Sequence, residues 1–101
     1  MESVLVMAKD EHLRLGYSAV LSAAGYMPYA TAELAVDLFA AIVDMGDDLD
    51  KHGAELARLN LVKVIYIVSK GWMGTIPPSG AERYILSKPT TAEAIIKYLK
   101  S

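Results

Sequence analysis

Three residues that could act together in phosphoryl chemistry each follow or close a short apolar run of this chain. One run leads into Asp44, the next into Ser69, and the third into Lys88, which precedes Pro89. A carboxylate can attack phosphorus as a nucleophile, while an ammonium group and a hydroxyl can bind the oxygens of a transferred phosphoryl group. If the runs are neighbouring parallel strands, their carboxyl ends meet at one sheet edge, where ligands bind in open α/β sheets.

The elements that would position these residues are strands that alternate with helical segments. Uninterrupted apolar runs are typical of strands that are buried on both faces. Such alternation indicates a parallel sheet with right-handed crossovers. The pattern predicts strands at residues 4–8, 27–30, 39–43, 62–68 and 84–86.

Three segments between or after these strands carry helical signals. After Asp10, apolar residues recur at helical spacing as far as Gly25, which suits the position just beyond a helix end. Residues 54–59 support a second helix. Thr90 and Glu93 match a capping box, with threonine at the N-cap, and predict the start of a third helix.

Length and composition limit the class of protein. With 101 residues, of which 53% are hydrophobic, we expect residues 1–101 to form one domain around one core. The absence of cysteine excludes disulfides, thiolate metal sites and thiol catalysis. No apolar run approaches the ~20 residues of a membrane span, and the first residues lack a secretory signal, so we expect a cytoplasmic location without membrane contact. A net charge of -2 with scattered basic residues argues against nucleic acid as a partner.

Several short segments of the chain match one family in their order and spacing. Together they resemble the receiver domain of bacterial two-component response regulators over nearly the whole length. The matching segments are Val4–Val6, Asp10–Leu13, Leu21–Tyr26, Ile42–Asp44, Gly53–Leu56, Ile67–Ser69 and Tyr84–Pro89.

The resemblance implies an α/β, flavodoxin-like fold, a doubly wound five-stranded parallel sheet with strand order 2-1-3-4-5. The second and fourth helices are expected to be shortened, because residues 31–38 leave room for one or two helical turns and residues 71–80 form a Gly- and Pro-rich loop. The reduced fourth helix resembles a divergent group of single-domain receivers. The Lys88–Pro89 bond is expected to be cis, since cis bonds occur at X-Pro.

The function that the resemblance implies is phosphorelay signalling by a single-domain response regulator. Asp44 would accept a phosphoryl group from a histidine kinase, Lys88 would bind its oxygens, and Ser69 would hydrogen-bond it once formed. The chain would then act on a protein effector through contacts alone, as a monomer or weak homodimer, and would not itself be an enzyme.

The resemblance also implies Mg²⁺, which receivers hold with two acidic side chains at the end of the first strand and with the acceptor aspartate. The ion places positive charge between the attacking carboxylate and the anionic phosphoryl group. One alignment puts Ala8 and Lys9 at the acidic pair, and another, with one deletion in the first helix, puts Lys9 and Asp10 there. The expected metal ligands are therefore Asp10 and Asp44, and Lys9 stands where a second acidic ligand belongs.

Two other functions fit the same residues. In one, Lys9 pairs with Asp44 in place of the metal, and the chain is a pseudo-receiver, an interaction module that works without phosphorylation. Lys9 could equally point to solvent at the strand end, as most lysines do. In the other, the chain is a small flavodoxin-like enzyme or anion-binding domain that uses the crevice for an anionic metabolite. The short crossovers disfavour this last function, because they offer few loops to enclose a substrate.

A group of large apolar residues follows the fourth strand. Trp72, Met73, Ile76 and Tyr84 lie in or after the Gly-rich loop. They either fold back over the sheet, where a fourth helix is missing, or form an exposed anchor for a partner protein. We favour the first arrangement.

Overall fold

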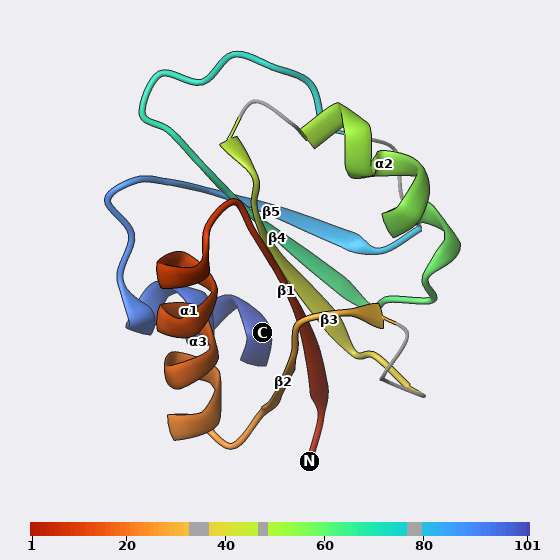
Figure 1. Ribbon diagram of the computed structural model, residues 1–101, viewed down its shortest axis with the longest axis vertical. Coiled ribbons are helices and arrows are strands. Elements are labelled where there is room, and N and C mark those ends of the chain that lie inside the picture. The colour runs from red at the N-terminus through yellow and green to blue at the C-terminus, as the bar shows by residue number, and fades with distance from the viewer. Residues whose placement is uncertain (33–36, 47–48, 77–79) are drawn as a thin grey trace.

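The computed structural model describes residues 1–32, 37–46, 49–76 and 80–101, which form five strands and three helices (Figure 1). Among these residues, no helix is long and apolar enough to cross a membrane. The elements in chain order are β1 (Ser3–Ala8), α1 (Glu11–Ala23), β2 (Met27–Tyr29), β3 (Ala40–Asp44), α2 (Leu49–Arg58), β4 (Lys63–Val68), β5 (Glu82–Ser87) and α3 (Ala92–Lys100).

The five strands form one parallel sheet in the order β2-β1-β3-β4-β5, as predicted, and the architecture is a flavodoxin-like α/β fold. Helices α1 and α3 cover one face of the sheet, and α2 lies over the other (Figure 1). Strands β3 and β4 are buried along their whole length because both faces are covered. This double burial is why they are near-continuous apolar runs in the sequence.

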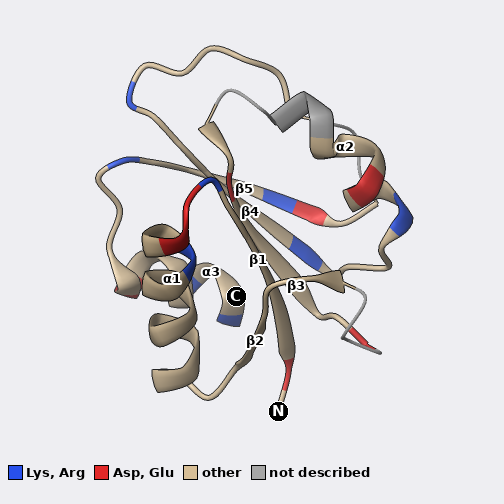
Figure 2. Ribbon diagram, in the orientation of Figure 1, with Lys and Arg blue, Asp and Glu red and all other residues tan. Residues whose placement is uncertain are grey.

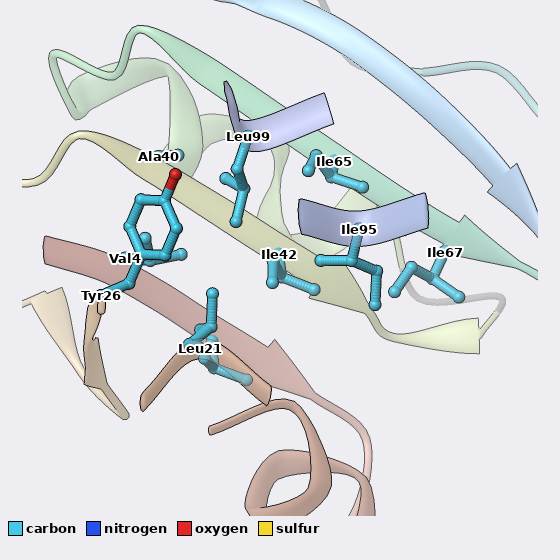
Figure 3. Packing of buried hydrophobic residues seen from close by; sticks show 10 residues of the cluster. Val4, Leu21, Tyr26, Ala40, Ile42, Ile65, Ile67, Ile95 and Leu99 are labelled. Atoms are coloured by element: carbon cyan, nitrogen blue, oxygen red, sulfur yellow. The ribbon is translucent and has the colours of Figure 1, made fainter. Parts of the chain in front are cut away.

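The core has two parts, one on each face of the sheet. On the α1/α3 face, Val4, Ile42 and Ile67 from three strands pack against Leu21 and Ile95 from the two helices (Figure 3). The cluster on the opposite face contains eight buried residues: Leu5, Ala41, Val43, Leu56, Leu61, Val64, Tyr66 and Val68. Alternate residues of each strand thus enter different parts of the core.

No helix forms in the described part of the connection between β4 and β5, residues 69–76 and 80–81. Trp72 and Ile76 instead pack against the cluster on the α2 face, which confirms the favoured arrangement for these two residues. Tyr84 packs on the opposite face, with its ring centroid 4.8 Å from that of Tyr98. Met73 is 94% exposed, so it does not pack over the sheet.

Two helix boundaries differ from the prediction. Helix α2 begins at Leu49, five residues before the predicted start at 54. The N-cap of α3 is Thr91 rather than Thr90: its backbone is extended, and its side chain accepts a hydrogen bond from the amide of Ala94. The predicted short helix after residue 31 falls largely on residues 33–36, outside the described residues.

The ends of two helices are closed in different ways. Gly25 follows α1 with φ +90°, the left-handed conformation that favours glycine after a helix, as predicted. The C-terminus of α3 is closed by Lys63, a buried residue at the start of β4. Its ammonium group donates hydrogen bonds to the carbonyl oxygens of Tyr98, Leu99 and Ser101. No local pattern in the sequence indicates this contact, because lysine and helix end lie more than 30 residues apart.

Candidate functional site

The carboxyl edge of the sheet brings together the residues that the sequence singled out. Asp44 is the last residue of β3, Ser69 follows β4, and Lys88 follows β5. The chain turns away after Lys88 through a cis Lys88–Pro89 bond, as predicted. The three strands are neighbours in the sheet, so these side chains belong to one region of its edge.

The carboxylate of Asp44 is enclosed and both of its oxygens have partners. Its side chain is only 2% exposed. The Lys88 ammonium nitrogen lies 3.0 Å from Oδ1 in an ion pair. The hydroxyl of Tyr17 donates a hydrogen bond of 2.5 Å to Oδ2. A buried carboxylate needs such partners, because an unpaired charge away from water is very costly.

Tyr17 comes from α1 and is the site residue that the sequence pattern did not single out. Helix α1 begins at the carboxyl edge of the sheet, and long helical side chains slant toward the helix N-terminus. The ring of Tyr17 therefore reaches back toward the end of β3. Burial, the hydrogen bond to Asp44 and the negative charges of Asp44 and Asp10 all raise the pKa of the Tyr17 hydroxyl. The hydroxyl stays protonated and donates to Asp44.

One signal for Tyr17 was present in the sequence. It lies on the buried stripe of α1, where its ring contributes as an apolar group. A tyrosine on such a stripe carries a hydroxyl that needs a hydrogen-bond partner, and this requirement points to a polar group on the facing sheet. Asp44 is that group, 27 residues further along the chain.

A cleft of about 780 Å³ lies beside the enclosed carboxylate, between α1, α3 and the loops after β4 and β5. Ser69 and Lys88 line it together with Tyr17. Ser69 is exposed, and its carbonyl oxygen accepts a hydrogen bond from the amide of Trp72, which begins the turn after β4. The structure thus places the predicted hydroxyl and ammonium in one cleft, with Asp44 covered behind Tyr17 and Lys88.

Lys9 does not reach the carboxylate of Asp44. Ala8 pairs with Asp44 across β1 and β3, so Lys9, one residue further, falls on the opposite face of the sheet. Its amide donates a hydrogen bond of 2.8 Å to the main-chain carbonyl of Asp44. Its exposed side chain instead lies beside Gly46, where a methyl group in place of the glycine hydrogen would meet Cδ and Nζ of Lys9 at 3.5 Å. The cation that holds Asp44 is therefore Lys88.

The described donors do not match a Mg²⁺ site. Asp10 acts as the N-cap of α1, since its Oδ1 accepts a hydrogen bond of 2.9 Å from the amide of Leu13. Both oxygens of Asp44 already have partners, one of them a cation. Within the described ranges, no three His, Cys, Asp or Glu side chains lie close enough together to hold a metal ion. Mg²⁺ prefers an octahedral set of oxygen ligands, which these two aspartates do not begin to fill.

Comparison of the chain with protein-family models, with curated proteins and with solved structures finds no match. The function is therefore inferred from the geometry of this site. The site consists of a buried carboxylate held by a lysine and a tyrosine, beside a cleft lined by a serine and two lysines.

Proposed function

We propose that this chain is a receiver-like signalling module that acts through protein contacts without phosphorylation of Asp44. The five-stranded order, Asp44 at the end of β3 and Lys88–Pro89 after β5 support the receiver-like part of the proposal. The observation that carries the rest is the enclosure of Asp44. Its side chain is 2% exposed, with Lys88 on one oxygen and Tyr17 on the other.

This enclosure opposes phosphotransfer for a chemical reason. An attacking carboxylate oxygen must approach phosphorus in line with the leaving group, with cations to balance the charge of the transferred oxygens. In this site the hydroxyl of Tyr17 donates a hydrogen bond to Oδ2 of Asp44, and the ammonium group of Lys88 forms an ion pair with Oδ1. A phosphodonor would have to displace Tyr17 before it could reach Asp44.

The same contacts suit a structural role for Asp44. The carboxylate joins the end of β3 to α1 through Tyr17 and to the loop after β5 through Lys88. These links hold together the elements that surround the cleft. In the proposed function they keep one surface of the module in a fixed form for a protein effector.

A second candidate is the phosphoryl-accepting receiver, in which a histidine kinase modifies Asp44 with Mg²⁺. The position of Lys88, 3.0 Å from Oδ1, favours it, because this ammonium could bind a phosphoryl oxygen after Tyr17 moved away. Ser69 in the adjoining cleft is a hydrogen-bond donor for the same group.

Incubation with acetyl phosphate and Mg²⁺, read by intact mass, separates the two candidates. We expect the wild-type chain to gain no phosphoryl mass under conditions in which a phosphorylatable receiver is fully modified. The Asp44→Asn variant is the control for modification elsewhere. An adduct on the wild type that is absent from Asp44→Asn overturns the proposal and supports the second candidate.

The Tyr17→Phe variant tests the physical reason within the same experiment. It keeps the ring but removes the hydroxyl that donates a hydrogen bond to Oδ2 of Asp44. An adduct on Tyr17→Phe, without one on the wild type, would identify this hydroxyl as the group that blocks the acceptor. The thermal midpoint with and without Mg²⁺ is a second readout, since an ion that binds only the folded state raises it. We expect no change.

A further inference from the structure

The cleft beside Asp44 has the size and walls of a small-molecule site. Its volume of about 780 Å³ lies in the range of roughly 300–1,000 Å³ that is usual for ligand pockets. Leu13 and Val20 of α1 and Ile95 of α3 supply apolar walls. An apolar lining with a few polar groups at one place is the usual composition of such sites.

Four polar residues of the cleft lie where the loops after β4 and β5 meet it, and two more, His12 and Tyr17, lie on α1. These loops carry the blue segments next to the carboxyl ends of the two strands in Figure 2, and they hold Lys70 and Lys88. Lys88 forms an ion pair with Asp44, but an ammonium group has three donors and the side chain is 40% exposed, so it can also bind a ligand. Lys70 is exposed, and Ser69 and Thr90 add hydroxyls. This end of the cleft therefore favours a negative group.

The carboxylate of Asp44 does not cancel that preference. Asp44 is not part of the cleft lining, because Tyr17 and Lys88 cover it. Its charge is balanced by the ion pair with Lys88. Lys70 then remains as a further cation at the cleft, together with the N-terminal end of α3, whose first residue Ala92 lines it.

A glycine inside α1 keeps the cleft open. Gly16 lies in the middle of the helix, where alanine is the more stable residue. A methyl group at Gly16 would meet no atom within 4 Å, so packing does not require a glycine here. Gly16 lines the cleft, so a large side chain at this position would start from its wall and have room to fill it. The glycine thus contributes space to the cleft while it lowers the stability of the helix.

We propose that this cleft binds a small organic anion with an apolar body. The apolar part lies between α1 and α3, over Gly16, and the negative group lies against Lys70 and the outer side of Lys88. This site goes beyond the proposed function, which assigns no ligand to the cleft.

The experiment uses two probes of nearly the same shape. Anilinonaphthalene sulfonate carries an apolar ring system and one negative charge, and phenylnaphthylamine lacks the charged group. Fluorescence titration measures the affinity of each probe for the full chain, and amide NMR spectra locate it. We expect one molecule of the anion per chain, bound about tenfold more tightly than the neutral probe, because only the anion gains a charge-assisted contact. The amide shifts should fall on residues 12–20, 69–70 and 88–95.

Two variants with matched controls test the two halves of the site. Gly16→Leu should weaken both probes about tenfold or more by filling the cleft, whereas Gly16→Ala should retain most of the affinity. Lys70→Gln should weaken the anion several-fold and leave the neutral probe unchanged. Lys100→Gln, at the far end of α3 and outside the cleft, should change neither. Lys70 is exposed, so its variant remains informative even if Gly16→Leu perturbs the helix.

Four results would overturn the proposal. The first is equal affinity for the two probes, and the second is a Lys70→Gln variant that binds the anion as well as the wild type. The third is a set of NMR shifts confined to residues outside the cleft, for example residues 52–58 of α2 on the other face of the sheet. The fourth is movement of the cleft resonances with protein concentration alone, which would show a second copy of the chain on this surface.

Discussion

Removal of the Tyr17 hydroxyl tests the central contact of the site. Tyr17→Phe keeps the ring and its packing but deletes the 2.5 Å hydrogen bond to Oδ2 of Asp44. A hydrogen bond to a charged group contributes about 1.5–3 kcal/mol, and the 2% exposure of the Asp44 side chain leaves little solvent screening. Water in the adjoining cleft can replace part of the bond, so we expect the free energy of unfolding to fall by about 2 kcal/mol.

The effect should depend on the charge of Asp44, and a double-mutant cycle measures this dependence. In an Asp44→Asn background the tyrosine meets a neutral amide, for which a hydrogen bond contributes only about 1 kcal/mol. The coupling energy between the two positions should therefore be about 1 kcal/mol. Urea unfolding, followed by circular dichroism and by the fluorescence of Trp72, gives the four free energies.

The thermal midpoint offers an independent measure of the same change. For a chain of 101 residues, 1 kcal/mol corresponds to roughly 4–8 °C, so Tyr17→Phe should lower the midpoint by about 10 °C. Tyr29→Phe, in the edge strand β2, is the matched control and should change the free energy by less than about 0.5 kcal/mol. A cost below about 0.5 kcal/mol for Tyr17→Phe in both backgrounds would refute the contact with a buried, charged Asp44.

Three further predictions concern pH, the α3 terminus and the glycines. Because folding raises the pKa of Tyr17, its protonated hydroxyl contributes to stability in full below about pH 10, and this contribution is lost as the pH rises further. The fall in unfolding free energy at alkaline pH should therefore be shallower in Tyr17→Phe. Lys63→Met should cost about 2 kcal/mol in urea unfolding, because it leaves carbonyl oxygens of α3 without their donor, while Lys100→Met should cost less than about 0.5 kcal/mol. Gly25→Ala should destabilise by about 1–2 kcal/mol because φ is +90°, and Gly16→Ala should stabilise by about 0.5–1 kcal/mol; equal effects of the two would contradict the assigned conformations.

Much of the fold could be predicted because burial leaves a local pattern. Strand β4 is buried on both faces and is accordingly an apolar, β-branched run, and the prediction of residues 62–68 differs from the structure by one residue. The end of α1 could be predicted from Gly25, whose conformation is a local backbone property.

The candidate site could be predicted only in part. Asp44, Ser69 and Lys88 follow strands, and parallel strands necessarily bring their carboxyl ends to one edge. The surroundings of the Asp44 carboxylate could not be predicted from its place at the end of a strand. Whether its carboxylate faces water, a metal or a tyrosine depends on the helix that packs over the strand end, and α1 supplies Tyr17 there.

The sequence by itself determined the strands, their parallel order through the family resemblance, and the edge at which the polar residues gather. Apolar runs and turn residues record burial and backbone conformation over a few neighbours, so these features are visible in the chain. Tertiary structure decided the partners: Tyr17 meets Asp44 across 27 residues, Lys63 meets the end of α3 across 35 or more, and Lys9 falls on the face away from the carboxylate. These outcomes depend on the rotation of each helix and the register of each strand, which only the packing of the whole chain sets.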